Sequence, residues 1–189
     1  MAKHTLVALV ENKPGVLNRV ASLFRRRGFN IESIAVGHTE VPGLSRMTIV
    51  VDGTVASVEQ VRKQLDKLID VVRVSDITDD STIARELALV KVKASPATRS
   101  EIIQIVDIFR ANIVDVASDS VTVEVTGDED KIDSLFRLLK GFGIREVART
   151  GQIAMTRGVA GPLTVDEAKP LREAPRAKRV KSTDEISNL

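Results

Sequence analysis

The apolar pattern of this chain occurs twice, and this repetition limits the folds it can adopt. Leu87 follows Leu6 by 81 residues, and Phe109 follows Phe24 by 85 residues. Some apolar runs alternate as in strands, and others repeat with the period of a helix. In each half they follow the order strand, helix, strand, strand, helix, strand. This order predicts an α+β fold with two consecutive ferredoxin-like βαββαβ domains, each an antiparallel sheet with both helices on one face.

The expected elements follow from the spacing of the apolar residues. In the first half we expect strands at 5–10, 30–37, 45–52 and 71–77 and helices at 16–24 and 57–69. In the second half we expect strands at 87–94, 113–116, 121–125 and 143–147 and helices at 96–109 and 129–139. Ser57 and Gln60 have the spacing of a capping box, and Ser95 before Pro96 is typical of an N-cap.

These elements divide the chain into two domains and a tail. We expect the first domain at 3–78 and the second at 84–157. Val7 and Leu9 are apolar although they point away from the expected helices, so a partner chain or the neighbouring domain should cover that face. From 158 to 189 the periodicity fades, and six basic residues accompany one acidic residue between 169 and 181. We expect a flexible basic tail there, either a solvated linker or a segment that reaches an acidic patch on a partner.

The residue types present exclude several kinds of chemistry. Cys is absent, which removes disulfides, thiolate metal sites and a Cys nucleophile. His4 and His38 are the only histidines, and their spacing is not that of metal ligands. No Ser lies in a nucleophile elbow, and the one glycine-containing strand-to-helix turn lacks the lysine of a P-loop. We therefore expect no catalytic and no metal-binding residues.

Two binding classes are also disfavoured. Proteins that bind single-stranded RNA with this strand order stack bases on exposed aromatic residues, but aromatics are only 3% of this chain and the strand at 45–52 has none. No run approaches 18 apolar residues and no signal peptide is recognisable, so we expect a cytoplasmic protein without a membrane span.

The turn at 11–17 is the best candidate for a binding site. Pro14 suits the start of a helix, and Gly15 lacks the side chain that would keep a ligand away from the first helical amides. Those amides have no partner inside the helix and lie at its positive end, so they suit a carboxylate or phosphate. Taken alone, the loop favours a plain capped turn without a ligand, because a Pro-Gly pair is common in turns.

Three stretches carry a family resemblance: VENKPGVL at 10–17, FRRRGFNIES at 24–33 and LSRMT at 44–48. Together they closely resemble the small regulatory subunit of acetohydroxyacid synthase (acetolactate synthase), whose first domain is an ACT domain. The resemblance spans roughly residues 3 to 158 and leaves the tail outside.

The resemblance implies a function that spacing alone only permits. Members of the family are not catalytic. They bind the thiamine-diphosphate-dependent large subunit, raise its activity and confer feedback inhibition by valine in branched-chain amino-acid biosynthesis. Thiamine diphosphate, Mg²⁺ and FAD are expected in that catalytic partner and no cofactor in this chain.

In this family ACT domains pair as homodimers, and the effector lies between the first turn of one chain and the second strand of the other. Carried over by position, one wall is Asn12, Lys13, Pro14, Gly15, Val16 and Leu17, and the opposite wall is Asn30 and Ile31.

The chemistry of these residues suits an aliphatic amino acid. The amides near Gly15 are expected to bind its carboxylate, Asn12 and Asn30 its ammonium, and Leu17 and Ile31 its side chain. Burying a valine side chain contributes about 1.5–3 kcal/mol, too little to separate valine cleanly from leucine or isoleucine. Two alternatives stay open: an ACT-type amino-acid sensor that regulates another enzyme or transcription, and a structural adaptor without a ligand.

Overall fold

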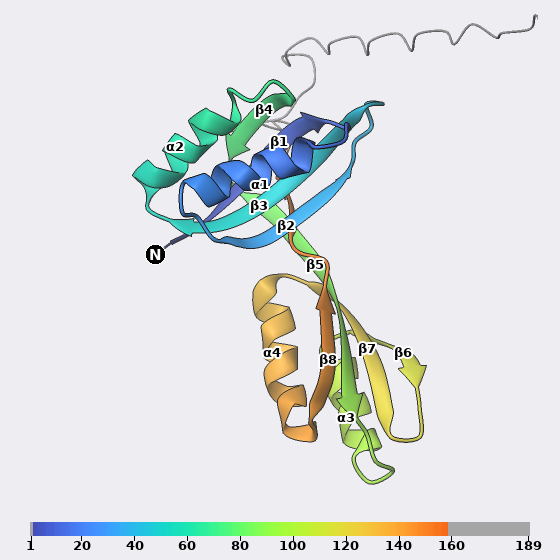
Figure 1. Cartoon of the computed structure of the whole chain (residues 1–189). Coiled ribbons are helices and arrows are strands. Elements are labelled where there is room, and N and C mark those ends of the chain that lie inside the picture. Colours follow the sequence, from blue (N-terminus) through green and yellow to red (C-terminus); the bar gives the residue numbers. More distant parts are fainter. Residues whose placement is uncertain (1, 159–189) are drawn as a thin grey trace, which may run out of the picture.

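The computed structural model describes residues 2–158, which form two α+β lobes joined end to end (Figure 1). The tail expected at 158–189 lies outside the described residues except for Gly158. Within the described part of the chain, no helix is long and apolar enough to cross a membrane.

The first lobe contains the six elements expected for one βαββαβ unit. They are β1 (Ala2–Glu11), α1 (Val16–Arg26), β2 (Ile31–His38), β3 (Leu44–Gly53), α2 (Val55–Leu65) and β4 (Val71–Asp76). The sheet order is β2-β3-β1-β4 with antiparallel neighbours, so β2 and β4 are the edge strands.

The second lobe repeats this arrangement and adds a strand. Its elements are β5 (Thr82–Lys93), α3 (Arg99–Ile108), β6 (Asn112–Val116), β7 (Ser120–Gly127), α4 (Glu129–Leu139), a 3₁₀ turn (Lys140–Phe142), β8 (Ile144–Arg149) and β9 (Ile153–Thr156). The sheet order β6-β7-β5-β8 matches that of the first lobe. The predicted fold class is therefore confirmed.

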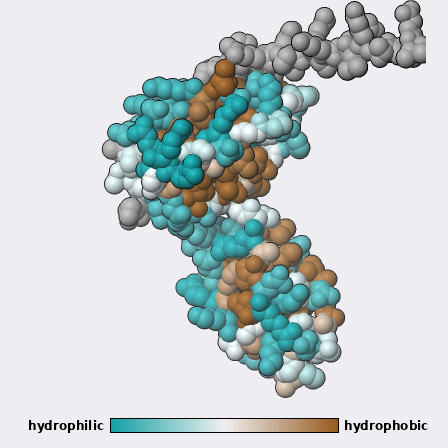
Figure 2. Space-filling model, in the orientation of Figure 1, coloured by the Kyte–Doolittle hydropathy of each residue, from teal (hydrophilic) through white to brown (hydrophobic). Residues whose placement is uncertain are grey.

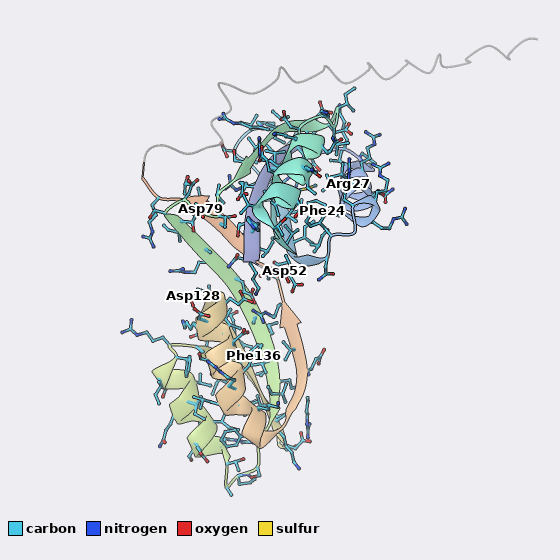
Figure 3. The ribbon with its side chains drawn as sticks, turned by 90° about the vertical axis from the view of Figure 1, so that its left-hand side faces the viewer. Phe24, Arg27, Asp52, Asp79, Asp128 and Phe136 are labelled. Carbon is cyan, nitrogen blue, oxygen red and sulfur yellow. The ribbon has the colours of Figure 1, made fainter. Side chains whose placement is uncertain are left out.

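Each lobe has an aliphatic core between its helices and its sheet. In the first, the even-numbered residues Leu6, Ala8 and Val10 of β1 meet Val20 and Phe24 of α1. In the second, Ala88, Val90 and Val92 of β5 meet residues of α3 and α4. Figure 3 shows Phe24 and Phe136 in the two separate lobes. Because strand side chains alternate between faces, one face of each sheet supplies the core and the other must be covered or solvated.

A ribbon of β5 and β9 covers part of the outer face of the first sheet. The pairing runs from Thr82 opposite Thr156 to Arg85 opposite Ile153. Val7 packs there against Ile77, Ala84 and Ala154 in a small buried cluster of its own. The second lobe's chain thus covers Val7, whereas Leu9 is buried by Val41, Leu44 and Val72 of the first lobe.

Two helix starts differ from the sequence prediction. The capping box predicted at Ser57 and Gln60 is wrong, because Thr54 is the N-cap of α2 and Ser57 is its N3 residue. Ser95 likewise does not cap α3 directly. It exchanges hydrogen bonds with Thr98 in a turn, and α3 begins at Arg99. In both places a serine and a threonine three residues apart form hydrogen bonds with each other. The sequence pattern alone did not distinguish these pairs from neighbouring residues that could also cap a helix.

The corrected cap leads to a stability prediction. Thr54→Ala removes the side chain that accepts from the Ser57 amide at 3.3 Å, so it is expected to lower the free energy of unfolding by about 1 kcal/mol. Gln60→Ala, at the position that the sequence pattern favoured, is the matched control and should change it little. Chemical denaturation of the two variants would measure the difference, and a larger loss for Gln60→Ala would contradict the assignment.

Candidate functional site

The turn between β1 and α1 exposes the start of a helix with no side chain across it. Gly15 is the N-cap residue with φ 86° and ψ −10°, a left-handed conformation that favours glycine, and no side chain caps the helix. A Cβ placed on Gly15 would meet no atom within 4 Å. The first amides of α1 therefore lie beside open space, at the end of the helix that attracts anions.

The backbone on both sides holds this turn in place. The Glu11 amide donates to the Asp70 carbonyl at 2.8 Å, and the Asn12 amide donates to the Gly43 carbonyl at 2.8 Å. The β2–β3 turn therefore supports the loop, a contribution that sequence reasoning missed because Gly43 is far along the chain. These hydrogen bonds make the turn between β1 and α1 a fixed feature of the fold.

The acidic groups beside the turn are paired with cations. Lys13 Nζ donates to Glu11 Oε2 at 2.7 Å, and Arg19 forms an ion pair with Asp70. An incoming carboxylate therefore meets paired acids and the positive helix end. Because the Lys13 cation is engaged with Glu11, its side chain is a structural part of the turn.

The remaining members of the first wall differ in what they expose. Leu17 has 49% of its surface exposed, whereas Val16 is 3% exposed and belongs to the core, and the Val16 amide donates to the Lys13 carbonyl at 3.4 Å. Asn12 is exposed, and its Nδ2 lies 3.4 Å from His38 Nδ1 at the end of β2. The structure thus brings the six predicted residues of this wall together on one turn, as their positions in sequence require.

The second wall lies at the other end of β2. Asn30 is exposed and its Nδ2 donates to Glu32 Oε1 at 2.5 Å, which makes Oδ1 the acceptor of that amide. Ile31 is half-buried and packs against the core of the first lobe. An acceptor thus lies next to an apolar side chain.

Within one chain the two walls do not meet. Asn12 lies beside His38, and Ile31 is seven residues earlier on the same strand, which corresponds to about 23 Å of extended chain. The site residues predicted from the sequence are therefore in two groups, one at each end of β2.

The region between these two groups has an apolar surface. Val36, in the second half of β2, is 48% exposed. Figure 2 shows hydrophobic side chains gathered over β2 on the first lobe. An exposed apolar edge strand is a surface on which another chain can pack.

A second recess lies between the two lobes and was not predicted. It has a volume of about 370 Å³ and is lined by both lobes, with Ser33 and Ile34 on one side and Arg149 to Gln152 on the other. Lys3 Nζ donates to Glu129 Oε1 at 2.5 Å across it, and this bond raises the pKa of Lys3. Because this pair is half exposed, it contributes little stability.

Arg149 is the most heavily engaged cation beside that recess. It bonds to Glu86 and to Asp133, and its guanidinium lies 5.9 Å from the centroid of the Phe136 ring. The bond to Glu86 is the main cause that raises the pKa of Arg149. In the described range 2–158, no group of three or more His, Cys, Asp or Glu residues could hold a metal ion.

Comparisons with known proteins give consistent results for both lobes. Residues 6–73 match the family model "AHAS small subunit-like ACT domain", and residues 85–158 match "Small subunit of acetolactate synthase". The chain is 60% identical over 156 residues to a probable acetolactate synthase small subunit of Archaeoglobus fulgidus, covering 82% of this chain and 98% of that protein. It is 53% identical over 158 residues to the acetolactate synthase small subunit of Bacillus subtilis, covering 82% and 91%. The crystal structure of the acetolactate synthase small subunit from Thermotoga maritima superimposes with a TM-score of 0.78 at 43% identity, covering 85% of this chain and all of that one.

Proposed function

The chain belongs to the family of acetolactate synthase small subunits, which are regulatory subunits, and from this premise we propose that it binds a catalytic large subunit, activates it and confers feedback inhibition by valine. Thiamine diphosphate, Mg²⁺ and FAD belong to that large subunit in this proposal, and this chain supplies no catalytic residue. The role also requires both subunits to share a compartment, which we propose is the cytoplasm.

The observation that carries the effector proposal is the open turn at Gly15. The α1 amides there have no side-chain cap, and nothing lies within 4 Å of a Cβ at this position. Both features suit the close approach of a small carboxylate to the backbone. Leu17 is exposed beside those amides, so an apolar group attached to the same ligand would be covered by it.

A homodimer through β2 would complete the site. Two copies placed side by side, with their β2 edge strands antiparallel about a two-fold axis, bring the start of one strand opposite the end of the other. Ile31 and Asn30 of one chain would then face the turn that lies beside His38 in its partner. The apolar surface over β2 and the separation of about 23 Å expected for seven extended residues, close to the length of the strand, support this arrangement.

Amino-acid selectivity follows from the size of the apolar wall. Leu17 and Ile31 would enclose an aliphatic side chain, and burial of valine contributes about 1.5–3 kcal/mol more than no side chain. This difference separates valine from glycine or alanine. Leucine and isoleucine differ from valine by one methylene, which a hydrophobic pocket distinguishes only modestly.

Thermal unfolding of the full chain in the presence of each of the twenty amino acids tests the proposal. A ligand at 100 times its dissociation constant stabilises the folded state by about 2.7 kcal/mol, which raises the melting temperature measurably. We expect a shift with valine, smaller shifts with leucine and isoleucine, and none with charged amino acids. No shift with any amino acid would favour the adaptor without a ligand, and a shift with a polar amino acid would favour a sensor of another metabolite.

A further inference from the structure

We propose that the segment Thr150–Gln152, which we call the docking segment, transmits effector binding from the first domain to the second. This inference rests on the proposed function, because it takes the ligand at β2 as its starting point. The segment follows β8 of the second lobe and lies against Ser33 and Ile34 in the middle of β2. The strand that would contact the effector therefore also contacts the other domain.

The contact between the docking segment and β2 is close and specific. The Gln152 amide donates to Ser33 Oγ at 2.8 Å. Gly151 has φ 81°, and a Cβ at this position would lie 2.8 Å from the Ile34 carbonyl oxygen and 3.0 Å from Ser33 Oγ. Real Cβ atoms do not approach backbone this closely, so only glycine allows the segment to rest on the strand.

At its other end the docking segment is fixed to the sheet of the second lobe. The Thr150 amide donates to the Leu87 carbonyl at 3.0 Å, and the Leu87 amide donates to Thr150 Oγ1 at 3.1 Å. Leu87 lies on β5, and Thr150 directly follows β8. A displacement of the segment therefore acts on both of these strands.

The position on β2 suits a strand that responds to a ligand. Ser33 is two residues after Ile31, and the pairing of β2 with β3 is irregular between them. In the described chain β2 has a strand neighbour on one side only. A ligand that draws the start of β2 toward a second chain would thus move the strand at the point where the docking segment rests.

A second contact joins the first sheet to β9, the strand that follows the docking segment. Arg46 Nη2 donates to the Ala154 carbonyl at 2.7 Å, and Arg46 pairs with Gly37 of β2 across the ladder. The half-buried Arg46 therefore holds β9 on the sheet beside the docking segment. This hydrogen bond does not involve the docking segment, so we expect it to keep β9 attached to the first sheet when the docking contact is altered.

Gly151→Ala tests the transmission, with Gly158→Ala as the matched control. Both glycines have φ 81°, but a Cβ at Gly158 meets nothing within 4 Å, so only the first substitution adds a collision with β2. The full chain reconstituted with its catalytic large subunit would be assayed for inhibition by valine, and the valine dissociation constant would be measured by calorimetry. We expect Gly151→Ala to bind valine within about threefold of the parent while most of the inhibition by valine is lost, because the coupling between the two sites, typically about 5- to 150-fold in affinity, is interrupted. Gly158→Ala should match the parent in both measurements.

Reciprocity provides a readout that a merely structural role would not change. In the parent, adding the large subunit must change the affinity for valine by the same factor by which valine changes binding of the large subunit. In Gly151→Ala that change should disappear. Ser33→Ala, which removes the acceptor for the Gln152 amide, should weaken the coupling in the same direction, and Ser33→Thr, which keeps an oxygen, should restore it. The serine pair decides the question if Gly151→Ala does not fold.

The outcomes separate this inference from the proposed function. Valine binding and inhibition that both stay at parent levels in Gly151→Ala and in Ser33→Ala would overturn the transmission role and leave the proposed function standing. Loss of valine binding together with inhibition in Ser33→Ala would also overturn it, since the strand would then act on the site itself. A parent chain that binds no valine would overturn the proposed function and this inference with it.

Discussion

Gly15→Asp is expected to abolish valine binding and feedback inhibition while activation of the large subunit persists. The new carboxylate would occupy the open space beside the α1 amides, where the carboxylate of the effector is proposed to lie. Aspartate tolerates the left-handed conformation of Gly15 better than most residues, so the turn should keep its shape. Hydrogen bonds to charged groups contribute about 1.5–3 kcal/mol each, so losing even one weakens binding by roughly ten- to a hundredfold. Calorimetry with valine and an activation assay measure the two effects separately.

Two controls separate charge from shape. Gly15→Asn has nearly the same size and conformational tolerance without the charge, so it should retain more affinity for valine than Gly15→Asp. Gly158→Asp places the same charge at another glycine of positive φ with open surroundings, and it should bind valine as the parent does. Unchanged valine affinity in Gly15→Asp would show that the effector site lies elsewhere.

The domain architecture could be predicted because it depends on local patterns. Strand and helix periods recur in the same order in both halves, and each expected strand or helix of the two units is present within a few residues of its predicted bounds. The Gly15 turn was recognisable for the same reason, since a Pro-Gly pair between a strand and a helix has few conformations. The charged partners around it, such as Asp70 for Arg19, come from distant segments and could not be read from the spacing.

Features that depend on pairing between distant segments were not predictable. β9 is only four residues long, and it pairs with residues at the start of β5 that lie 68 to 74 positions earlier. A four-residue run with one buried residue carries too little periodicity to indicate a strand. The close contact of Gly151 with Ile34 has the same origin, because glycine in a sequence does not tell which backbone approaches it.

Irregularities within strands and helices could also not be predicted from the spacing of apolar residues. Strict alternation predicts Ile31 on the same face as Ser33 and Ala35, but the irregular pairing between Ile31 and Ser33 turns Ile31 to the core side with Ile34. The stripe expected to continue to Ile69 ends earlier, because α2 stops at Leu65 and Ile69 is exposed. For the candidate site, the sequence proposes the members of each wall, but it does not indicate how far apart one chain holds them.

Because one chain holds the two walls far apart, two variants that each fail to bind valine are expected to recover binding when they are mixed. Gly15→Asp damages the first wall. Asn30→Lys damages the second wall by placing a cation where the ammonium of the effector would lie, and we expect neither variant to bind valine by itself. Asn30 is exposed and its neighbour Glu32 can pair with the new lysine, so the fold should tolerate the change. In a mixed dimer one site combines both damaged walls and the other combines both intact walls. Equal mixing gives half mixed dimers, so about a quarter of all sites should recover valine binding.

The matched negative control is a mixture of two variants damaged in the same wall. Leu17→Asp alters an exposed side chain of the first wall, so mixing it with Gly15→Asp leaves every site with a damaged first wall and should restore nothing. Native mass spectrometry would verify that the subunits exchange, and calorimetry would count the active sites. If exchange is complete and the Gly15→Asp and Asn30→Lys mixture still binds no valine, the two walls do not meet across chains. Recovery in this mixture alone requires that one effector contacts the first turn of one chain and the second strand of another, because a site within one chain would carry its own defect into every mixed dimer.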